Sequence, residues 1–187
     1  MIRTSNYKSF IEVSKVTVSI SRDCGEDAGY IGDAYLDLAP EKSLLKKYHK
    51  NIGVIPEYEN VKDYITEYWN NVLSKLDPEK VYKDLNNKIL LCYERSYEFC
   101  HRHVVAAWLE VLLEKEVPEI ENDYGKLKVV DRPEYIKEML EEVMRQNQDM
   151  QGFTSLRALY LHNKGNEEEA KNIENEYKKY VKKRTNN

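Results

Sequence analysis

Residues 88–93 read Lys-Ile-Leu-Leu-Cys-Tyr, a short apolar run with polar residues before and after it. A run of this length is typical of a strand buried on both faces, and such strands occur mainly in parallel sheets covered by helices. The segment 16–20, Val-Thr-Val-Ser-Ile, is rich in β-branched residues and predicts a second strand. Any fold of this chain must therefore cover both faces of at least one strand.

Helical patterns lie between these two strands and after them. Apolar side chains recur at three- and four-residue intervals over 61–76, Pro78 suits the first turn of a short helix to Leu85, and a third helix is predicted over 99–114. The order strand, helix, strand, helix implies a right-handed crossover and a parallel sheet. We therefore expect an α/β fold with a small, mainly parallel, Rossmann-like sheet flanked by helices, and an extra strand at 118–121.

After residue 130 the pattern becomes purely helical, so we divide the chain into an α/β domain, 1–130, and a C-terminal α-helical extension, 131–187. Apolar stripes predict helices over 135–144 and 153–160, followed by a last helix. Because the core already has helices to cover its sheet, we expect the stripe at 135–144 to contact a partner, most simply a second copy in a homodimer.

Composition excludes several classes of protein. The 187 residues include 29 basic and 33 acidic side chains, a net charge of −4, which argues against a globally basic nucleic-acid binder. The short basic end at 182–184 gives only weak support for nucleic acid. No apolar run approaches the ~20 residues that span a bilayer, so no membrane partner is expected. Three unevenly spaced cysteines argue against a disulfide framework and for a reducing, cytoplasmic location.

The loop after 88–93 leads into a helix that opens with Cys100-His101-Arg102. Ligands of parallel α/β proteins bind beyond the carboxyl ends of the strands, and a helix N-terminus attracts anions and lowers the pKa of a cysteine. Histidine transfers protons near neutral pH, and arginine binds phosphate or carboxylate groups. We therefore predict Cys100, His101 and Glu94 as catalytic residues and Arg102 as an anion ligand.

The strand at 16–20 should end at the same edge of a parallel sheet, where it delivers Ser21 and Arg22. We expect both residues to bind an anion together with Arg102. A structural alternative is that the two arginines form ion pairs with Asp23 and Glu94 instead.

Plain structural explanations also exist for the cysteines and histidines. Cys92 lies inside an apolar run and is expected to pack in the core, and Cys100 can serve as a capping or packing residue. No metal and no cofactor is expected, because zinc usually takes four ligands at tighter spacing than Cys92 and Cys100 offer. Three further histidines are expected to be structural or bystanders: His49, His103 and His162.

Several separate segments resemble the domain of unknown function 488 family. The stretch LLCYERSYEFCHRHVVAAWLE is similar to the closing motif of that family, in which an apolar strand ends in Leu-Cys-x-Glu and Cys-His-Arg opens the next helix. The matching residues are Leu91, Cys92, Glu94, Cys100, His101 and Arg102. The segments TSNY at 4–7 and SISR at 19–22 are similar to the N-terminal pattern of the family. The resemblance covers residues 1–121; it implies the fold and the position of the site, and no named reaction.

Three functions stay open at this point. The leading hypothesis is a protein that binds a small anionic, phosphorylated or nucleotide-like ligand at the Cys-His-Arg turn, with or without acting on it through a thiol nucleophile. A second is a non-catalytic anion sensor whose helical extension contacts a protein or nucleic acid. A third is thiol redox chemistry or metal binding by the cysteines.

Overall fold

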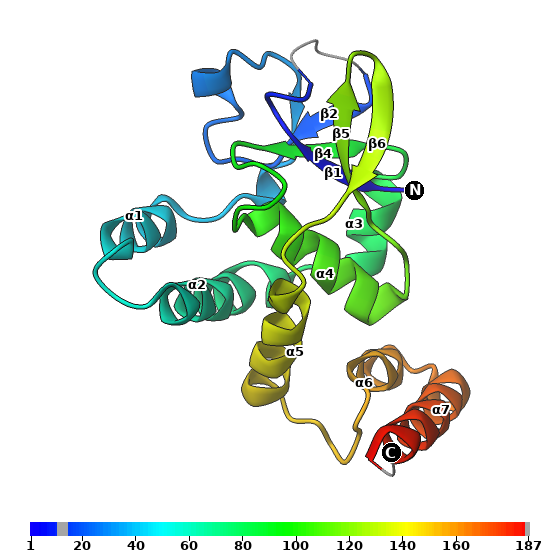
Figure 1. Ribbon diagram of the computed structural model, residues 1–187. Coiled ribbons are helices and arrows are strands. Elements are labelled where there is room, and N and C mark those ends of the chain that lie inside the picture. Colours follow the sequence, from blue (N-terminus) through cyan, green and yellow to red (C-terminus); the bar gives the residue numbers. More distant parts are fainter. Residues whose placement is uncertain (11–14, 186–187) are drawn as a thin grey trace.

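The computed structural model describes residues 1–10 and 15–185, which form an α/β fold around a six-stranded sheet (Figure 1). The strand order is β3-β2-β4-β1-β5-β6, and neighbouring strands are parallel except for the pair β5 and β6. The strands are Arg3–Asn6 (β1), Thr17–Ser19 (β2), Asp33–Ala34 (β3), Ile89–Cys92 (β4), Glu119–Asp123 (β5) and Lys126–Val130 (β6). The predicted mainly parallel sheet flanked by helices is confirmed.

Strand β4 lies inside the sheet, where β2 pairs with one edge and β1 with the other. All four of its residues are buried, as the apolar run at 88–93 predicts. Its side chains alternate between two cores: Leu90 belongs to the large core that contains the helices, whereas Ile89 and Leu91 pack with Tyr7 and Tyr30 on the opposite face. Because β2 and β4 are parallel neighbours, the polar residues that follow them lie at the same edge of the sheet.

Strand β1 is an interior strand that the sequence pattern does not predict. Its residues read Arg-Thr-Ser-Asn, and Thr4, Ser5 and Asn6 are buried in spite of their polar side chains. The Ser5 hydroxyl donates a hydrogen bond of 2.6 Å to the carbonyl oxygen of Ile120, which replaces the water that it loses on burial. Pairing with β4 and β5, and not apolar periodicity, thus holds this segment in the sheet.

The helices are Lys42–Asn51 (α1), Glu57–Asn71 (α2), Pro78–Asp84 (α3), His101–Leu113 (α4), Tyr135–Asn147 (α5), Leu156–Asn163 (α6) and Glu167–Thr185 (α7). All of these except α1 overlap predicted segments. Helix α2 begins and ends earlier than the predicted 61–76, and a 3-10 turn, Leu73–Lys75, follows it. Asp77 caps α3 by accepting a hydrogen bond from the Glu79 amide, and Pro78 occupies the first turn. Helix α4 runs along the sheet beside β1 and β4 (Figure 1). No helix in the described part of the chain is long and apolar enough to cross a membrane.

The C-terminal helices fold back onto the α/β part of the same chain. Helix α5 packs on α2 and α4, and its apolar stripe, which includes Ile136, Leu140 and Val143, is buried in the core that these helices share. An ion pair of 2.8 Å between Lys62 and Glu142 joins α2 to α5 at the surface. Assigning a dimer interface to the stripe is therefore wrong, because α2 and α4 already cover it; association of two copies through another surface stays untested.

Candidate functional site

A cavity of about 250 Å³ opens where β2 and β4 end, beside the N-terminus of α4. Its lining comes from the residues that follow β2, from the residues that follow β4, from one side of α1, and from the first residue of α4. The lining residues are Ser21, Arg22, Asp23, Pro40, Lys42, Leu45, His49, Cys92, Tyr93, Glu94 and His101. This is the sheet edge at which the sequence predicts a site, and the cavity combines cationic, acidic, thiol and imidazole groups.

A larger hollow of about 490 Å³ lies between α2, α4, α5 and α6. Trp69, Trp108 and Tyr160 contribute to its wall, which contains neither cysteine nor histidine. Its volume exceeds that of the first cavity, but the groups that can act as nucleophile or base at neutral pH line the smaller of these two. We therefore take the smaller cavity as the candidate site.

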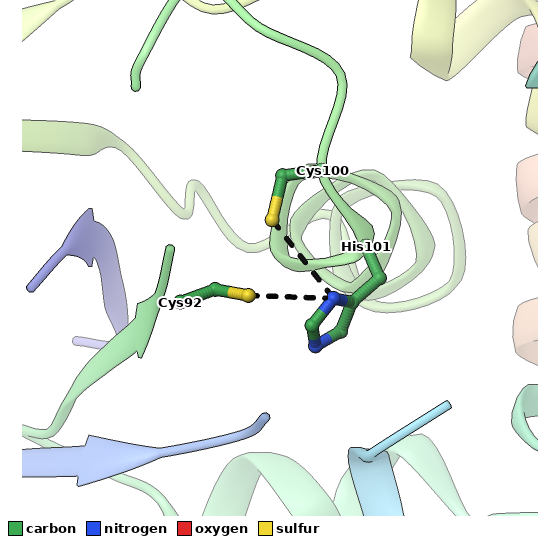
Figure 2. Close-up of side chains that lie close together, drawn as sticks. All are labelled: Cys92, Cys100 and His101. Atoms are coloured by element: carbon green, nitrogen blue, oxygen red, sulfur yellow. Dashed lines mark hydrogen bonds between the residues drawn. The ribbon is translucent and has the colours of Figure 1, made fainter. Parts of the chain in front are cut away.

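The chemical centre of the cavity is formed by Cys92, Cys100 and His101, whose side chains point toward one another (Figure 2). The Nδ1 atom of His101 lies 3.5 Å from the sulfur of Cys92 and 3.9 Å from the sulfur of Cys100. The sulfur of Cys92 also lies 3.4 Å from a carboxyl oxygen of Glu94. Two thiols, an imidazole and a carboxyl group are thus within hydrogen-bonding range of one another.

The second ring nitrogen of His101 fixes the state of the ring. Nε2 lies 2.9 Å from the carbonyl oxygen of Ile20, which can only accept a hydrogen bond, so Nε2 carries a proton. In the neutral ring Nδ1 then presents its lone pair to the two thiols. Burial alone would lower the pKa of His101, but the adjacent Cys100 outweighs burial and raises that pKa. The pair therefore favours a thiolate beside an imidazolium.

The charges around the two thiols place the thiolate on Cys100. Burial opposes its ionisation, yet the hydrogen bond from Cys92 and the positive charges of Arg102 and His101 lower the pKa of Cys100 well below its usual value. Burial and the neighbouring Cys100 raise the pKa of Cys92. Both cysteines are almost fully buried, but Cys92 lines the cavity and Cys100 does not.

Glu94 stays protonated at neutral pH. Burial, together with the nearby Cys100, raises its pKa to about 8. The folded protein therefore binds more protons than the unfolded chain between the ordinary glutamate pKa of 4.5 and about pH 8, so stability falls as pH rises through this window. A neutral carboxyl group at this place can donate a proton or a hydrogen bond to a ligand.

The variant Glu94→Gln removes this titration while it keeps the shape of the side chain. At pH 4 we expect the variant and the native protein to have the same free energy of unfolding. At pH 8 we expect the free energy of unfolding of the variant to be larger by roughly 1–3 kcal/mol, a range that allows for screening by solvent in the cavity. Urea denaturation at a series of pH values measures the difference. The matched control is Glu116→Gln, which replaces an exposed glutamate and should leave the pH dependence of stability unchanged. If the stability difference between Glu94→Gln and the native protein does not vary with pH, Glu94 ionises normally.

A network of hydroxyl groups reaches the cavity through Ser21 and Tyr93. The Tyr7 hydroxyl lies 2.6 Å from the Ser19 hydroxyl and 2.7 Å from that of Ser21, and Ser21 donates to Asp23 at 2.8 Å. Tyr93 also donates to Asp23. Ser21, a predicted anion ligand, therefore reaches the cavity but is already engaged in this network.

Arg22, the second predicted anion ligand from this edge, also lines the cavity. Its Nε donates a hydrogen bond of 2.9 Å to the carbonyl oxygen of Pro40, and its Nη2 donates to that of Ala39. The guanidinium group thus fastens the segment before α1 to the edge of the sheet, and it brings a positive charge to the cavity.

Arg102 is placed differently from its neighbour His101. Its side chain is fully buried and forms an ion pair with Glu119 on β5, with nitrogen–oxygen distances of 2.9 and 3.1 Å. His103 lies 3.4 Å from the same carboxylate. Arg102 does not line the cavity. It forms a structural ion pair, as the alternative to anion binding expected, but its partner is Glu119 and not Asp23 or Glu94.

Sequence reasoning missed several residues of the cavity, among them Cys92, Lys42 and His49. Cys92 was expected to pack in the core, but strand alternation could have shown that it shares a side with Glu94 and with Leu90, which faces the helices. Lys42 and His49 were missed because the helix that carries them, α1, was not predicted. The spacing in the sequence also gave no sign that the fold brings Cys92 and Cys100 together across the loop.

Taken together, fold and site define an α/β protein with a thiol–imidazole centre at the carboxyl edge of its sheet. The chain belongs to the DUF488 family: residues 5–112 match the model DUF488-N3a, described as the active DUF488-N3 subclade. The match includes all the strands and helices that build the cavity and ends within α4, before the helices α5 to α7. No curated protein and no solved structure matches the chain.

Proposed function

We propose that this cavity binds a small phosphorylated or nucleotide-like ligand and that its thiol–imidazole centre acts on the bound molecule. The observation that carries the proposal is the meeting of three kinds of group in one cavity: cationic Arg22 and Lys42, the Cys92–Cys100–His101 centre, and protonated Glu94. The N-terminus of α4, which has no side-chain cap, adds a favourable environment for an anion.

The chemistry that fits these groups is group transfer through a covalent thiol intermediate. The thiolate attacks an electrophilic phosphorus or carbon atom of the ligand, a bond to sulfur forms, and the bond to the leaving oxygen breaks. Glu94 gives its proton to that oxygen. Water then attacks the intermediate, gives a proton back to Glu94, and releases the thiolate, so the net reaction is hydrolysis.

A non-catalytic anion sensor is the alternative, favoured by the near-complete burial of both thiols. Denaturing the purified protein and identifying any released small molecule by mass spectrometry gives the ligand class for both alternatives. Incubation with the identified compound then separates them, because an enzyme converts it and a sensor returns it unchanged.

Lys42 offers a direct test of the anion site. It lines the cavity from the first turn of α1 and is exposed, so its removal should not disturb the fold. We expect Lys42→Ala to weaken binding of a nucleoside monophosphate by about three- to tenfold in calorimetry, the loss of one charge-assisted contact. Lys46→Ala, one turn further along the same helix and outside the cavity, is the matched control. Equal affinities of the two variants would exclude α1 from the site.

A further inference from the structure

Cys92, Cys100 and His101 form a cluster of three metal-ligand atoms. Both sulfurs and Nδ1 of the ring lie within 4.8 Å of one another, and all three side chains are buried. The residues come from two elements: Cys92 ends β4, whereas Cys100 and His101 begin α4 (Figure 2). Two rigid elements, and not a flexible loop, therefore set the separation of the ligand atoms.

The distances fit a tetrahedral ion of the zinc type. With a zinc–sulfur bond of about 2.3 Å and a zinc–nitrogen bond of about 2.0–2.1 Å, two ligands at the tetrahedral angle are about 3.6 Å apart. The observed separations between sulfur and Nδ1 are 3.5 and 3.9 Å. These two separations thus need to change by only a few tenths of an ångström. The two sulfurs, which lie within 4.8 Å of each other, need to be about 3.8 Å apart to share such an ion.

The orientation of the His101 ring is a second, independent observation. Its Nε2 donates to the Ile20 carbonyl oxygen at 2.9 Å, which leaves Nδ1 as the nitrogen that faces the sulfurs and that can bind an ion once its proton is lost. Metal-binding histidines commonly have this arrangement, in which the distal N–H is held by a backbone carbonyl or carboxylate and the other nitrogen faces the ion. The backbone carbonyl of Ile20, directly after β2, therefore holds the ring in the orientation that coordination requires.

A fourth ligand position is available on the side of the cavity. A carboxyl oxygen of Glu94 lies 3.4 Å from the sulfur of Cys92, and the cavity that Cys92, Glu94 and His101 line gives an ion a path inward. Two thiolates and one imidazole are soft donors, which favour zinc over magnesium or calcium. An open fourth position is the arrangement of zinc sites that bind water or substrate.

We propose that Cys92, Cys100 and His101 bind a zinc ion, with the fourth position filled by Glu94 or by a molecule in the cavity. The site requires only the positions of these three ligand atoms and does not depend on the proposed function. A bound ion holds both thiolates as ligands, so it prevents their direct attack on a substrate. Metal-loaded and metal-free protein should therefore differ in thiol reactivity.

Cobalt(II) is the probe, because it takes tetrahedral zinc sites and has visible and near-ultraviolet absorption. We expect the full-length, reduced, chelator-treated protein to bind about one cobalt ion per chain with a thiolate-to-cobalt charge-transfer band, which zinc then abolishes by displacement. The band should be lost in Cys92→Ser/Cys100→Ser and kept in Cys24→Ser, whose thiol lies outside the cluster. Absence of the band in the native protein, or its persistence in the double variant, overturns the proposal.

A second measurement uses the native protein, so its result does not depend on whether the double variant folds. Saturating zinc should slow iodoacetamide labelling of Cys92 and Cys100 by about tenfold or more, while Cys24 reacts as before, because only bound thiolates lose their nucleophilicity. Equal protection of all three cysteines contradicts a specific site. Nucleotide binding is titrated separately with chelator-treated protein. Failure to bind cobalt contradicts the metal site alone, and failure to bind the nucleotide contradicts the anion site alone.

Discussion

Replacing Arg102 by methionine is expected to lower the free energy of unfolding by about 3–5 kcal/mol. The guanidinium is fully buried and lies 2.9 Å from the carboxylate of Glu119, which is buried as well. Without Arg102 this carboxylate keeps its charge in an apolar interior, with only His103 near it at 3.4 Å. Urea denaturation monitored by the fluorescence of the two tryptophans measures the loss.

Two further variants separate the ion pair from other causes. The double variant Arg102→Met/Glu119→Leu leaves no unpaired charge and should recover most of the lost stability. Lys80→Met breaks an exposed ion pair with Asp84 and should change stability little. If Arg102→Met is as stable as Lys80→Met, the ion pair does not hold Arg102 in place, and Arg102 is again available as an anion ligand.

Replacing His101 by glutamine is expected to raise the pH at which alkylation of Cys100 reaches half its maximal rate by about 1–2 units. His101 is one of the positive charges that lower the pKa of Cys100, and loss of an opposite charge at this range shifts a pKa by about 1–2 units. The curve of labelling rate against pH should therefore move to higher pH. In the native protein at pH 7 we expect iodoacetamide to label Cys100 before Cys92, because the thiolate lies on Cys100.

Peptide mapping after timed labelling gives the rate for each cysteine. His162→Gln, on α6 and far from the thiols in sequence, is the matched control and should leave all three rates unchanged. Because His101 is buried, circular dichroism and a urea titration must first show that His101→Gln folds. Labelling of Cys92 before Cys100, or an unchanged pH of half-maximal rate in His101→Gln, would show that access and not ionisation decides reactivity.

Local sequence patterns predicted those elements whose apolar side chains repeat within one segment. The run at 89–92 and the stripes of α2, α4 and α5 are of this kind, and each was located correctly. Strand β1 has no such pattern, because its neighbours β4 and β5 supply its partners from far along the chain. The structure of β1 is thus decided by tertiary pairing, which a single sequence window does not contain.

The same limit explains the partial prediction of the site. The Cys-His-Arg turn was expected to face one ligand as a unit, but successive helical residues point about 100° apart. His101 therefore meets the thiols, while Arg102 turns toward β5. Cys92 joins the centre because β4 and α4 are adjacent in space, which neither the strand nor the helix pattern could reveal alone.

Helix α4 packs against α2, which lies inside the region matched by the family, and against α5, which lies outside it. The family match ends at residue 112, yet the apolar sides of α2 and α4 form one core with Ile136, Leu140 and Val143 of α5. Cutting the chain at the end of the match would uncover this surface on the helix that carries His101. For expression and engineering, the smallest unit that can keep the site intact is therefore longer than the family region, and it must include α5.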